Sequence, residues 1–541
     1  MTTLRFKDII GPIMVGPSSS HTAGALRIAF MARQLCNAPL RRVEFRLFGS
    51  FAQTYHGHGT DRALVAGILG LATDDIRIRS SIELASSKGI ECVFTPLPQA
   101  SCDHPNTVEI VMTDSNDHTV EVRGISIGGG MALLTRINDV DLSISGERTS
   151  LVIKQRDSVG VLAHITHCIS EHNINIATTR LYRERKGSVA VTIVETDAPI
   201  PADLQRDIES APDIQLLRVI PAIDIVADTD ECDAKALSFA QSVDFTSADD
   251  IQTWCVQHDN ASLAKAFRTR EYACAKAEGT SEDTDDYANK VLEVMHSSLM
   301  LPLDKPLKTM GGLISGTTHT LVEHMPASQI CDDQLAHLII YSMAVLETNA
   351  SMGRIVAAPT AGSAGVIPAV LHLMREQGHT NDQLREGLYA AAAIGYLVTR
   401  NATVSGAEGG CQAEVGTASA MGAAAIVQIA GGSAAQCFDA AATALSNSMG
   451  LVCDPIGGLV EAPCQRRNAM GAANAFIGAQ ISLAHIPNLV PFDETVQALY
   501  KVGQSLPFEL RESALGGLAA TPTACAWCET RNSHHGCKSA Q

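Results

Sequence analysis

After about residue 245 the chain consists almost entirely of long segments with helical spacing of apolar residues, and this pattern constrains its fold most. The longest segments are rich in Ala and cover residues 335–350, 362–377, 384–398 and 414–429. Helices that are apolar over most of their surface have to pack against one another, so a buried helical bundle is predicted. Gly-rich stretches interrupt the bundle, and such breaks free backbone N–H groups that can line a site.

Three cysteines lie in these breaks. Cys411 follows two glycines, Cys453 precedes Asp-Pro, and Cys464 follows a proline. Irregular backbone of this kind can direct the sulfur atoms toward a shared point. Three thiolates without an obvious fourth ligand would leave one coordination position open, which is typical of a catalytic metal site. The alternative, which composition alone favours, is three free cysteines that pack as small apolar side chains.

Length, charge and cysteine content limit the number of domains and the kinds of partner to expect. A chain of 541 residues is too long for one core, and three or four domains are expected. The formal net charge of −18, without a basic tract, argues against nucleic acid and membrane surfaces as partners. The N-terminus carries no apolar signal segment and the apolar runs are too short to span a bilayer, so we expect a soluble cytoplasmic protein. Its 15 cysteines are then free thiols or metal ligands rather than disulfides.

Residues 1–147 alternate between strand and helix patterns and predict an α/β domain. The run Gly-Pro-Ser-Ser-Ser-His-Thr at 16–22 precedes a helical pattern, and Ser20 or Thr22 is the predicted helix cap. A loop rich in hydroxyl groups at a helix N-terminus suits an anion such as a substrate carboxylate. The alternative is a plain cap without a ligand.

A second loop, Tyr-His-Gly-His-Gly-Thr-Asp at 55–61, also lies before a helix. Because histidine titrates near neutral pH, His56 or His58 can act as a general base. The alternative is a polar surface loop.

Residues 150–222 form a self-contained unit in which strand and helix patterns follow the order βαββαβ, which is typical of ferredoxin-like folds. The run Asp-Ser-Val-Gly-Val-Leu at 157–162, with His-Asn-Ile-Asn-Ile at 172–176, resembles the ACT domain, a regulatory module that binds amino acids between paired copies. The resemblance gives Asp157, Gly160 and Asn175 the effector-contacting positions. The alternative is a module that only dimerises. Residues 223–245 are acidic and read as a linker, and 246–541 as an all-α catalytic domain with a C-terminal tail.

Several motifs together resemble the iron–sulfur-dependent L-serine dehydratases. The runs 16–22, Gly-His-Gly-Thr-Asp at 57–61 and Ser-Ile-Gly-Gly-Gly at 126–130 match the family's β domain. The runs 354–365, Gly-Cys-Gln-Ala-Glu-Val-Gly at 410–416 and Pro-Cys-Gln-Arg-Arg-Asn-Ala-Met-Gly at 463–471 match its α domain. The expected architecture is therefore a multidomain α+β protein with β, ACT and α domains in one chain.

The resemblance implies a 4Fe–4S cluster held by Cys411, Cys453 and Cys464, with one iron left open as a Lewis acid for the substrate hydroxyl. It implies the conversion of L-serine to pyruvate and ammonia, a lyase reaction of amino-acid catabolism and gluconeogenesis. His58 matches the family's base, although the sequence alone cannot rank it against His21 and His56. The other residues that the resemblance assigns to the site are Ser18, Ser19, Ser20, Thr22, Thr360, Ser363 and Asn468.

The C-terminal region offers a further ligand. Some single-chain relatives end in a cysteine that occupies the open iron, and Cys525 follows a similar Gly-Gly-Leu-Ala element at 516–519. Cys528 and Cys537 compete with it for this role.

Two rival functions are considered. A dehydratase that uses pyridoxal phosphate would need a lysine for the Schiff base, and the α domain is poor in lysine. A non-catalytic amino-acid sensor would leave the serine loop, the histidine loop and the three cysteines without a purpose. A homodimer is the expected assembly, since ACT modules pair and closed symmetry is usual.

Overall fold

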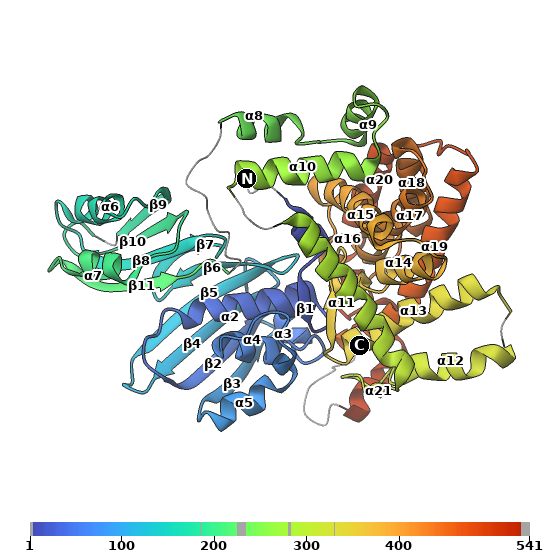
Figure 1. Ribbon diagram of the computed structural model, residues 1–541. Coiled ribbons are helices and arrows are strands. Elements are labelled where there is room, and N and C mark those ends of the chain that lie inside the picture. Colours follow the sequence, from blue (N-terminus) through green and yellow to red (C-terminus); the bar gives the residue numbers. More distant parts are fainter. Residues whose placement is uncertain (1–3, 184, 224–233, 280–282, 329, 532–541) are drawn as a thin grey trace.

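The computed structural model describes residues 4–183, 185–223, 234–279, 283–328 and 330–531, and its fold is mixed α and β. A sheet-rich N-terminal part precedes a helical C-terminal part (Figure 1). The predicted α+β fold class is therefore confirmed. Residues 224–233 of the predicted linker lie outside the described residues, and the part that follows them contains α8 (Ala234–Ser242). The domain boundaries themselves stay a prediction.

The N-terminal region contains a six-stranded sheet in the order β3-β2-β4-β5-β6-β7. Strand β2 is parallel to β3 and antiparallel to β4, and the remaining neighbours are antiparallel. Its strands are β2 (Leu40–Phe48), β3 (Glu91–Leu97), β4 (Thr107–Asp114), β5 (Thr119–Gly128), β6 (Met131–Ile137) and β7 (Val140–Ile144). The helical elements of this region are α1 (Phe6–Ile9), η1 (Ser19–Gly24), α2 (Ala25–Arg33), α3 (Gly49–Thr54), α4 (Thr60–Ile68), η2 (Ile76–Ser80) and α5 (Ser81–Ser87).

Side-chain alternation gives this sheet two different faces. In β2, Val43, Phe45 and Leu47 are buried in the same apolar core as residues of α2 and α4. Their neighbours Glu44 and Arg46 point to the opposite face, as the period of two in a strand requires. The apolar face therefore fixes α2 and α4, and with them the two loops that precede these helices.

Residues 149–220 form a separate four-stranded sheet in the order β11-β8-β10-β9 (Figure 1). All neighbouring strands are antiparallel, and two helices share an apolar core with the sheet. This order agrees with the ferredoxin-like arrangement expected from βαββαβ. The elements are β8 (Thr149–Arg156), α6 (Val161–Glu171), β9 (Ile176–Arg183), β10 (Val189–Thr196), α7 (Ala202–Glu209) and β11 (Ile214–Ile220).

The C-terminal region is a helical bundle. Its central helix is α17 (Thr417–Ile429), and nearly every residue of that helix is buried. Small residues allow the helices to approach closely: a Cβ on Gly387 would lie 2.7 Å from Ile429, and one on Gly478 would lie 2.8 Å from the carbonyl oxygen of Ala440. The bundle's longer helices are α9 (Ala248–Gln257), α10 (Leu263–Ala277), α11 (Thr284–Asp304), α12 (Thr317–Ser328), α13 (Asp333–Ala350), α14 (Val366–Glu376), α15 (Asn381–Asn401), α18 (Ala434–Ser448), α19 (Cys464–Leu483), α20 (Phe492–Ser505) and α21 (Pro522–Arg531). Its short elements are η3 (Ala361–Ser363), α16 (Gly406–Gly409), η4 (Gln412–Gly416), η5 (Ile456–Gly458), η6 (Phe508–Leu510) and η7 (Gly517–Ala520).

One short strand adds to the predicted all-helical region. Strand β12 (Arg354–Val356) pairs antiparallel with β1 (Ile13–Val15), and Ile13 lies opposite Val356. A strand of three residues cannot satisfy its backbone groups alone, so its partner had to come from a distant part of the chain. This pairing joins the N-terminal region to the bundle directly before the serine loop, residues 16–22.

Candidate active site

A cavity of about 240 Å³ lies between the N-terminal region and the helical bundle. Both regions contribute polar side chains to its wall. Those with hydroxyl, imidazole, thiol or carboxyl groups include Asp8, Ser18, Ser19, Ser20, His58, Thr360, Glu408, Cys411, Glu414, Cys453, Cys464 and Glu512. The structure thus brings together most of the residues that the sequence singled out, across the boundary between two folding units.

The three cysteines reach the cavity from breaks between helices. Cys411 lies at the start of η4, directly after Gly410, which has a φ of 74°. A Cβ on Gly410 would lie 2.9 Å from the carbonyl oxygen of Leu451, so only glycine fits there. Cys453 forms a single β-bridge with Arg511, and Cys464 is the first residue of α19. Each sulfur is therefore presented by irregular backbone rather than by a helix interior.

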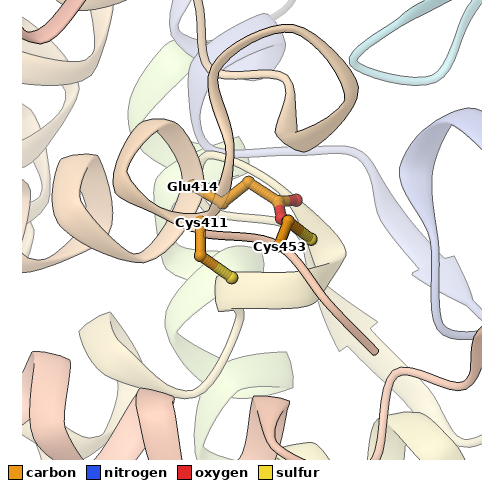
Figure 2. Close-up of side chains that lie close together, drawn as sticks. All are labelled: Cys411, Glu414 and Cys453. Carbon is orange, nitrogen blue, oxygen red and sulfur yellow. The ribbon is translucent and has the colours of Figure 1, made fainter. Parts of the chain in front are cut away.

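Glu414 joins the cysteines, and the sequence analysis did not identify it. One oxygen of its carboxyl group and the sulfur atoms of Cys411 and Cys453 all lie within 4.8 Å of one another (Figure 2). Thr360 donates a hydrogen bond of 2.8 Å to the same carboxyl group. Burial raises the pKa of Glu414 to about 7. A charged residue three positions after Cys411, in the otherwise uncharged segment 409–416, was the signal in the sequence.

Glu512 is a further acidic residue of the cavity wall, which also contains Asp8 and Glu408. Burial and the nearby Glu414 raise the pKa of its carboxyl group well above 4.5. Its backbone has a left-handed φ of 58°, and its N–H donates to the carbonyl oxygen of Cys453 at 2.9 Å. No local sequence pattern marks this residue, because its place depends on the packing of residues 508–520 against the Cys453 segment.

The thiols lie in an environment that disfavours charge unless a cation is bound. Hydrogen bonding to Cys411 and burial raise the pKa of Cys453 well above 9, and burial does the same for Cys464. One guanidinium is close, that of Arg467, 3.7 Å from the sulfur of Cys411 and 2.8 Å from Asp454. Thiolate ligands carry their negative charge most easily next to metal ions. Three sulfur donors in one cavity therefore fit an iron–sulfur group.

The serine loop differs in detail from the prediction. The side chain of Ser18, rather than that of Ser20 or Thr22, accepts the capping hydrogen bond, from the backbone N–H of His21 at 3.1 Å. Thr22 is used elsewhere, since its hydroxyl donates to the carbonyl oxygen of His58 at 2.8 Å. Ser18 has the right offset because η1 begins one residue later, which the pattern of three serines could not resolve. Thr22 is absent from the cavity wall among the described residues.

The two buried histidines have different surroundings. His21 Nδ1 lies 3.0 Å from the hydroxyl of Ser20, and its Nε2 lies 2.9 Å from that of Ser50. His58 is fully buried, and neither of its ring nitrogens has a hydrogen-bond partner in the described part of the chain. Burial lowers the pKa of His58 to about 4 and that of His21 well below 6.5.

Of these two, His58 is the one that lines the cavity. The third histidine of these loops, His56, points elsewhere: it is 59% exposed and pairs with Asp61 at 2.8 Å.

Two further predicted residues support the cavity wall without lining it. The side chain of Asn468 accepts from the N–H of Gly365 at 3.0 Å and donates to the carbonyl oxygen of Cys464 at 2.9 Å. The hydroxyl of Ser363 lies 3.1 Å from that of Thr360. Asn468 therefore connects the loop that carries Thr360 to the start of α19.

The C-terminal cysteines lie apart from the cavity wall in the described residues. The sulfur of Cys525, in α21, is 3.9 Å from the carbonyl oxygen of Ala519. Cys528 is buried and lies close to Gly457. Cys537 lies outside the described residues.

The predicted effector residues lie at separate places in the four-stranded unit. The carboxyl group of Asp157 accepts from the N–H of Gly187 at 2.9 Å, and Gly160 starts α6 with a φ of 95°. Asn175 lines a shallow hollow beside α6 and donates to Asp197 at 2.6 Å. Asp157 and Gly160 do not line this hollow.

No helix in the described ranges is long and apolar enough to cross a membrane.

Comparison with known proteins assigns two regions of the chain to one family. The serine dehydratase alpha chain model matches residues 225–519, and the serine dehydratase beta chain model matches residues 8–91. The fold and site thus define a chain that unites two regions found in some relatives as separate chains. The protein belongs to the serine dehydratase family.

Two named relatives each match one part of the chain, and a third matches nearly all of it. The probable L-serine dehydratase alpha chain of Bacillus subtilis is 46% identical over 248 residues, which is 46% of this chain and 82% of that one. The L-serine dehydratase beta chain of Peptoniphilus asaccharolyticus is 39% identical over 205 residues, covering 38% and 92% of the two chains. The L-serine dehydratase of Streptomyces coelicolor is 28% identical over 530 residues, covering 95% and 98%. The last comparison extends over nearly the whole of both proteins.

Proposed function

We propose that this protein is an L-serine ammonia-lyase that converts L-serine to pyruvate and ammonia, with a 4Fe–4S cluster held by Cys411, Cys453 and Cys464. The observation that carries the proposal is a single cavity lined by three cysteines and by a buried imidazole that has no hydrogen-bond partner in the described residues. The family assignment and the names of the relatives point to the same substrate.

His58 is the proposed base. Because its folded pKa is about 4, the ring is neutral near pH 7 and can accept a proton. When His58 takes the α-proton of serine, the C–H electrons form the Cα–Cβ double bond and the hydroxyl group leaves Cβ. A bound cluster would supply the Lewis acid that such a leaving group needs. The resulting enamine tautomerises and is hydrolysed to pyruvate and ammonia.

The remaining wall residues orient the substrate. The hydroxyl groups of Ser18, Ser19 and Ser20 can donate hydrogen bonds to its carboxylate, and His21 holds Ser20 in place through the contact of 3.0 Å. Thr360 contributes a further hydroxyl group. Thr22, Ser363 and Asn468 act as positioning residues in this proposal, because their bonds hold His58, Thr360 and the start of α19.

The residues of the cavity wall argue against the two rival functions, a pyridoxal-phosphate enzyme and an amino-acid sensor. A pyridoxal-phosphate enzyme needs a lysine amine, and no lysine is present in the described wall of the cavity. A sensor that only binds an amino acid would not need an unpartnered imidazole beside three thiols.

The ferredoxin-like unit supports a proposal about regulation and assembly. We propose that an amino-acid effector binds there, with Asp157, Gly160 and Asn175 as contacts, and that two copies of the chain pair as a homodimer. Asp157→Ala should abolish the response to the effector without changing the unregulated rate. Cys525 stays a candidate tail ligand: Cys525→Ala should then remove any lag before turnover, and unchanged progress curves would exclude this role.

The test is anaerobic purification and reconstitution with iron and sulfide, followed by measurement of pyruvate formed from L-serine. Cys411→Ala should keep the circular dichroism spectrum but lose bound iron and activity. Cys437→Ala is the matched control, because Cys437 is fully buried in the bundle and lies away from the cavity wall. Serine binding without pyruvate formation in the reconstituted wild type would favour the sensor, and iron-free protein absorbing as a Schiff base would favour pyridoxal phosphate.

A further inference from the structure

The proposed function leaves one charged group of the substrate unassigned, and the inference drawn here rests on that function. L-serine enters with a carboxylate, a hydroxyl and an ammonium group. The serine loop and the cysteine side of the cavity account for the first two. Moving an ammonium ion from water into a buried cavity is costly unless an anion meets it there.

Two carboxyl groups lie together in the cavity wall, on either side of a residue without a side chain. The position that a Cβ on Gly406 would take is 2.6 Å from Oε2 of Glu414 and 3.3 Å from Oε2 of Glu512. Gly406 itself lines the cavity. The two oxygens are therefore at most 5.9 Å apart. An ammonium nitrogen beside Gly406 that lies between them can approach both, since charge-assisted bonds span about 2.7–2.9 Å each.

Neither carboxyl group is neutralised by a neighbour. In the described part of the chain, Glu414 and Glu512 form no ion pair, and the nearby cation Arg467 is paired with Asp454 at 2.8 Å. Glu414 accepts a hydrogen bond from Thr360 on Oε1 at 2.8 Å and a long one from the Cys453 thiol on Oε2 at 3.9 Å, and a carboxylate oxygen has a second lone pair for a further donor. Buried carboxyl groups in this arrangement favour a cation from outside.

A separate observation indicates that this cavity is built to hold a ligand. His58 lines the same cavity, is fully buried, and has no hydrogen-bond partner on either ring nitrogen within the described ranges. A buried imidazole left without partners costs free energy in the empty protein, and a polar ligand would relieve that cost.

We propose that Glu512, with Glu414 beside it, binds the ammonium group of the substrate and thereby selects amino acids over hydroxy acids. Of the two, Glu512 carries the main role. Glu414 also lies close to the sulfur atoms of Cys411 and Cys453 and can share its charge with a bound metal group.

The experiment compares reconstituted wild type, Glu512→Gln and Glu509→Gln. Glutamine preserves shape and removes the charge, and Glu509 is exposed three residues earlier in the same segment. The probes are L-serine as substrate and 3-hydroxypropanoate as competitive inhibitor, since the latter keeps the hydroxyl and carboxylate but lacks the ammonium group. Iron and sulfide content are measured in every sample.

We expect Glu512→Gln to raise the KM for L-serine at least tenfold, about 1.4 kcal/mol, while the inhibition constant of 3-hydroxypropanoate changes less than threefold. Glu512→Asp, which keeps the charge, should recover part of the loss, and Glu509→Gln should match the wild type. Glu414→Gln should show the same selective loss, which provides a second test if Glu512→Gln does not fold.

Three results would overturn the assignment: a KM for Glu512→Gln within twofold of wild type, a parallel weakening of both probes, or loss of iron from Glu512→Gln while Glu509→Gln retains it. The last result would make Glu512 part of the metal site instead. Failure of the proposed function itself is distinguishable, because the reconstituted wild type would then form no pyruvate.

Discussion

Replacing His58 with leucine should stabilise the metal-free protein against unfolding. The same substitution should abolish the activity of the reconstituted protein. The imidazole is fully buried, and both ring nitrogens lack hydrogen-bond partners in the described residues. A buried polar group without a partner costs about 1–3 kcal/mol, and leucine occupies the site without that cost. At pH 8 we expect His58→Leu to raise the free energy of unfolding by about 1–3 kcal/mol.

The gain in the free energy of unfolding from His58→Leu should grow as the pH falls. Burial lowers the pKa of folded His58 from 6.5 to about 4. Between these values the unfolded chain binds a proton that the folded chain does not, so the wild-type free energy of unfolding decreases as the pH falls through this window. At about 1.4 kcal/mol for each pKa unit, the gain from His58→Leu at pH 5 should exceed the gain at pH 8 by about 2 kcal/mol.

Urea unfolding of metal-free wild type, His58→Leu and His56→Leu at both pH values provides the measurement. His56 is 59% exposed, so His56→Leu controls for the loss of a histidine and should give no gain at either pH. The reasoning is refuted if His58→Leu is less stable than wild type at both pH values, or if its gain does not depend on pH. Pyruvate formation by reconstituted His58→Leu should be lost, since no base then faces the α-proton.

Three further predictions concern the cavity's support and its metal group. Glu461→Ala should lower the free energy of unfolding by about 3 kcal/mol and reduce bound iron, because this buried carboxylate accepts from the backbone N–H of Leu313 at 2.7 Å and lies three residues before Cys464. The control is Glu494→Ala at an exposed position, which should change neither quantity. Unchanged urea midpoints for both variants would contradict the prediction. Glu271→Gln should cost about 3 kcal/mol in urea titrations, since it removes the negative charge that pairs with buried Arg270 at 2.6 Å and leaves one acceptor oxygen where the carboxylate uses two, the other for the N–H of Phe6; a cost under 1 kcal/mol would show that the pair is dispensable. Exposure of the reconstituted protein to air should remove iron and activity in parallel, and activity that outlasts the iron would exclude an exposed cluster.

Much of the fold was accessible from local pattern. The period of two in residues 42–48 records which face of that strand is buried, and the long apolar run in 384–398 predicts a helix that is buried on nearly all sides, as the structure shows. The abundance of Ala and Gly predicted close helix packing, and Gly387 and Gly478 show that contact directly. The pairing of β1 with β12 could not be predicted, because a strand of three residues carries too little pattern to identify its partner.

The sequence by itself determined which residue types were available for chemistry: three cysteines in helix breaks, a serine loop and a histidine loop. Only the tertiary structure decided which of them meet. It left the His58 ring without a hydrogen-bond partner in the described residues and placed hydroxyl groups beside both ring nitrogens of His21, a distinction that depends on packing around each ring rather than on the neighbouring residues in the sequence. It also brought Glu512 to Glu414 across Gly406, a contact between positions far apart in the chain. Such contacts form only when separate elements pack, which local sequence does not record.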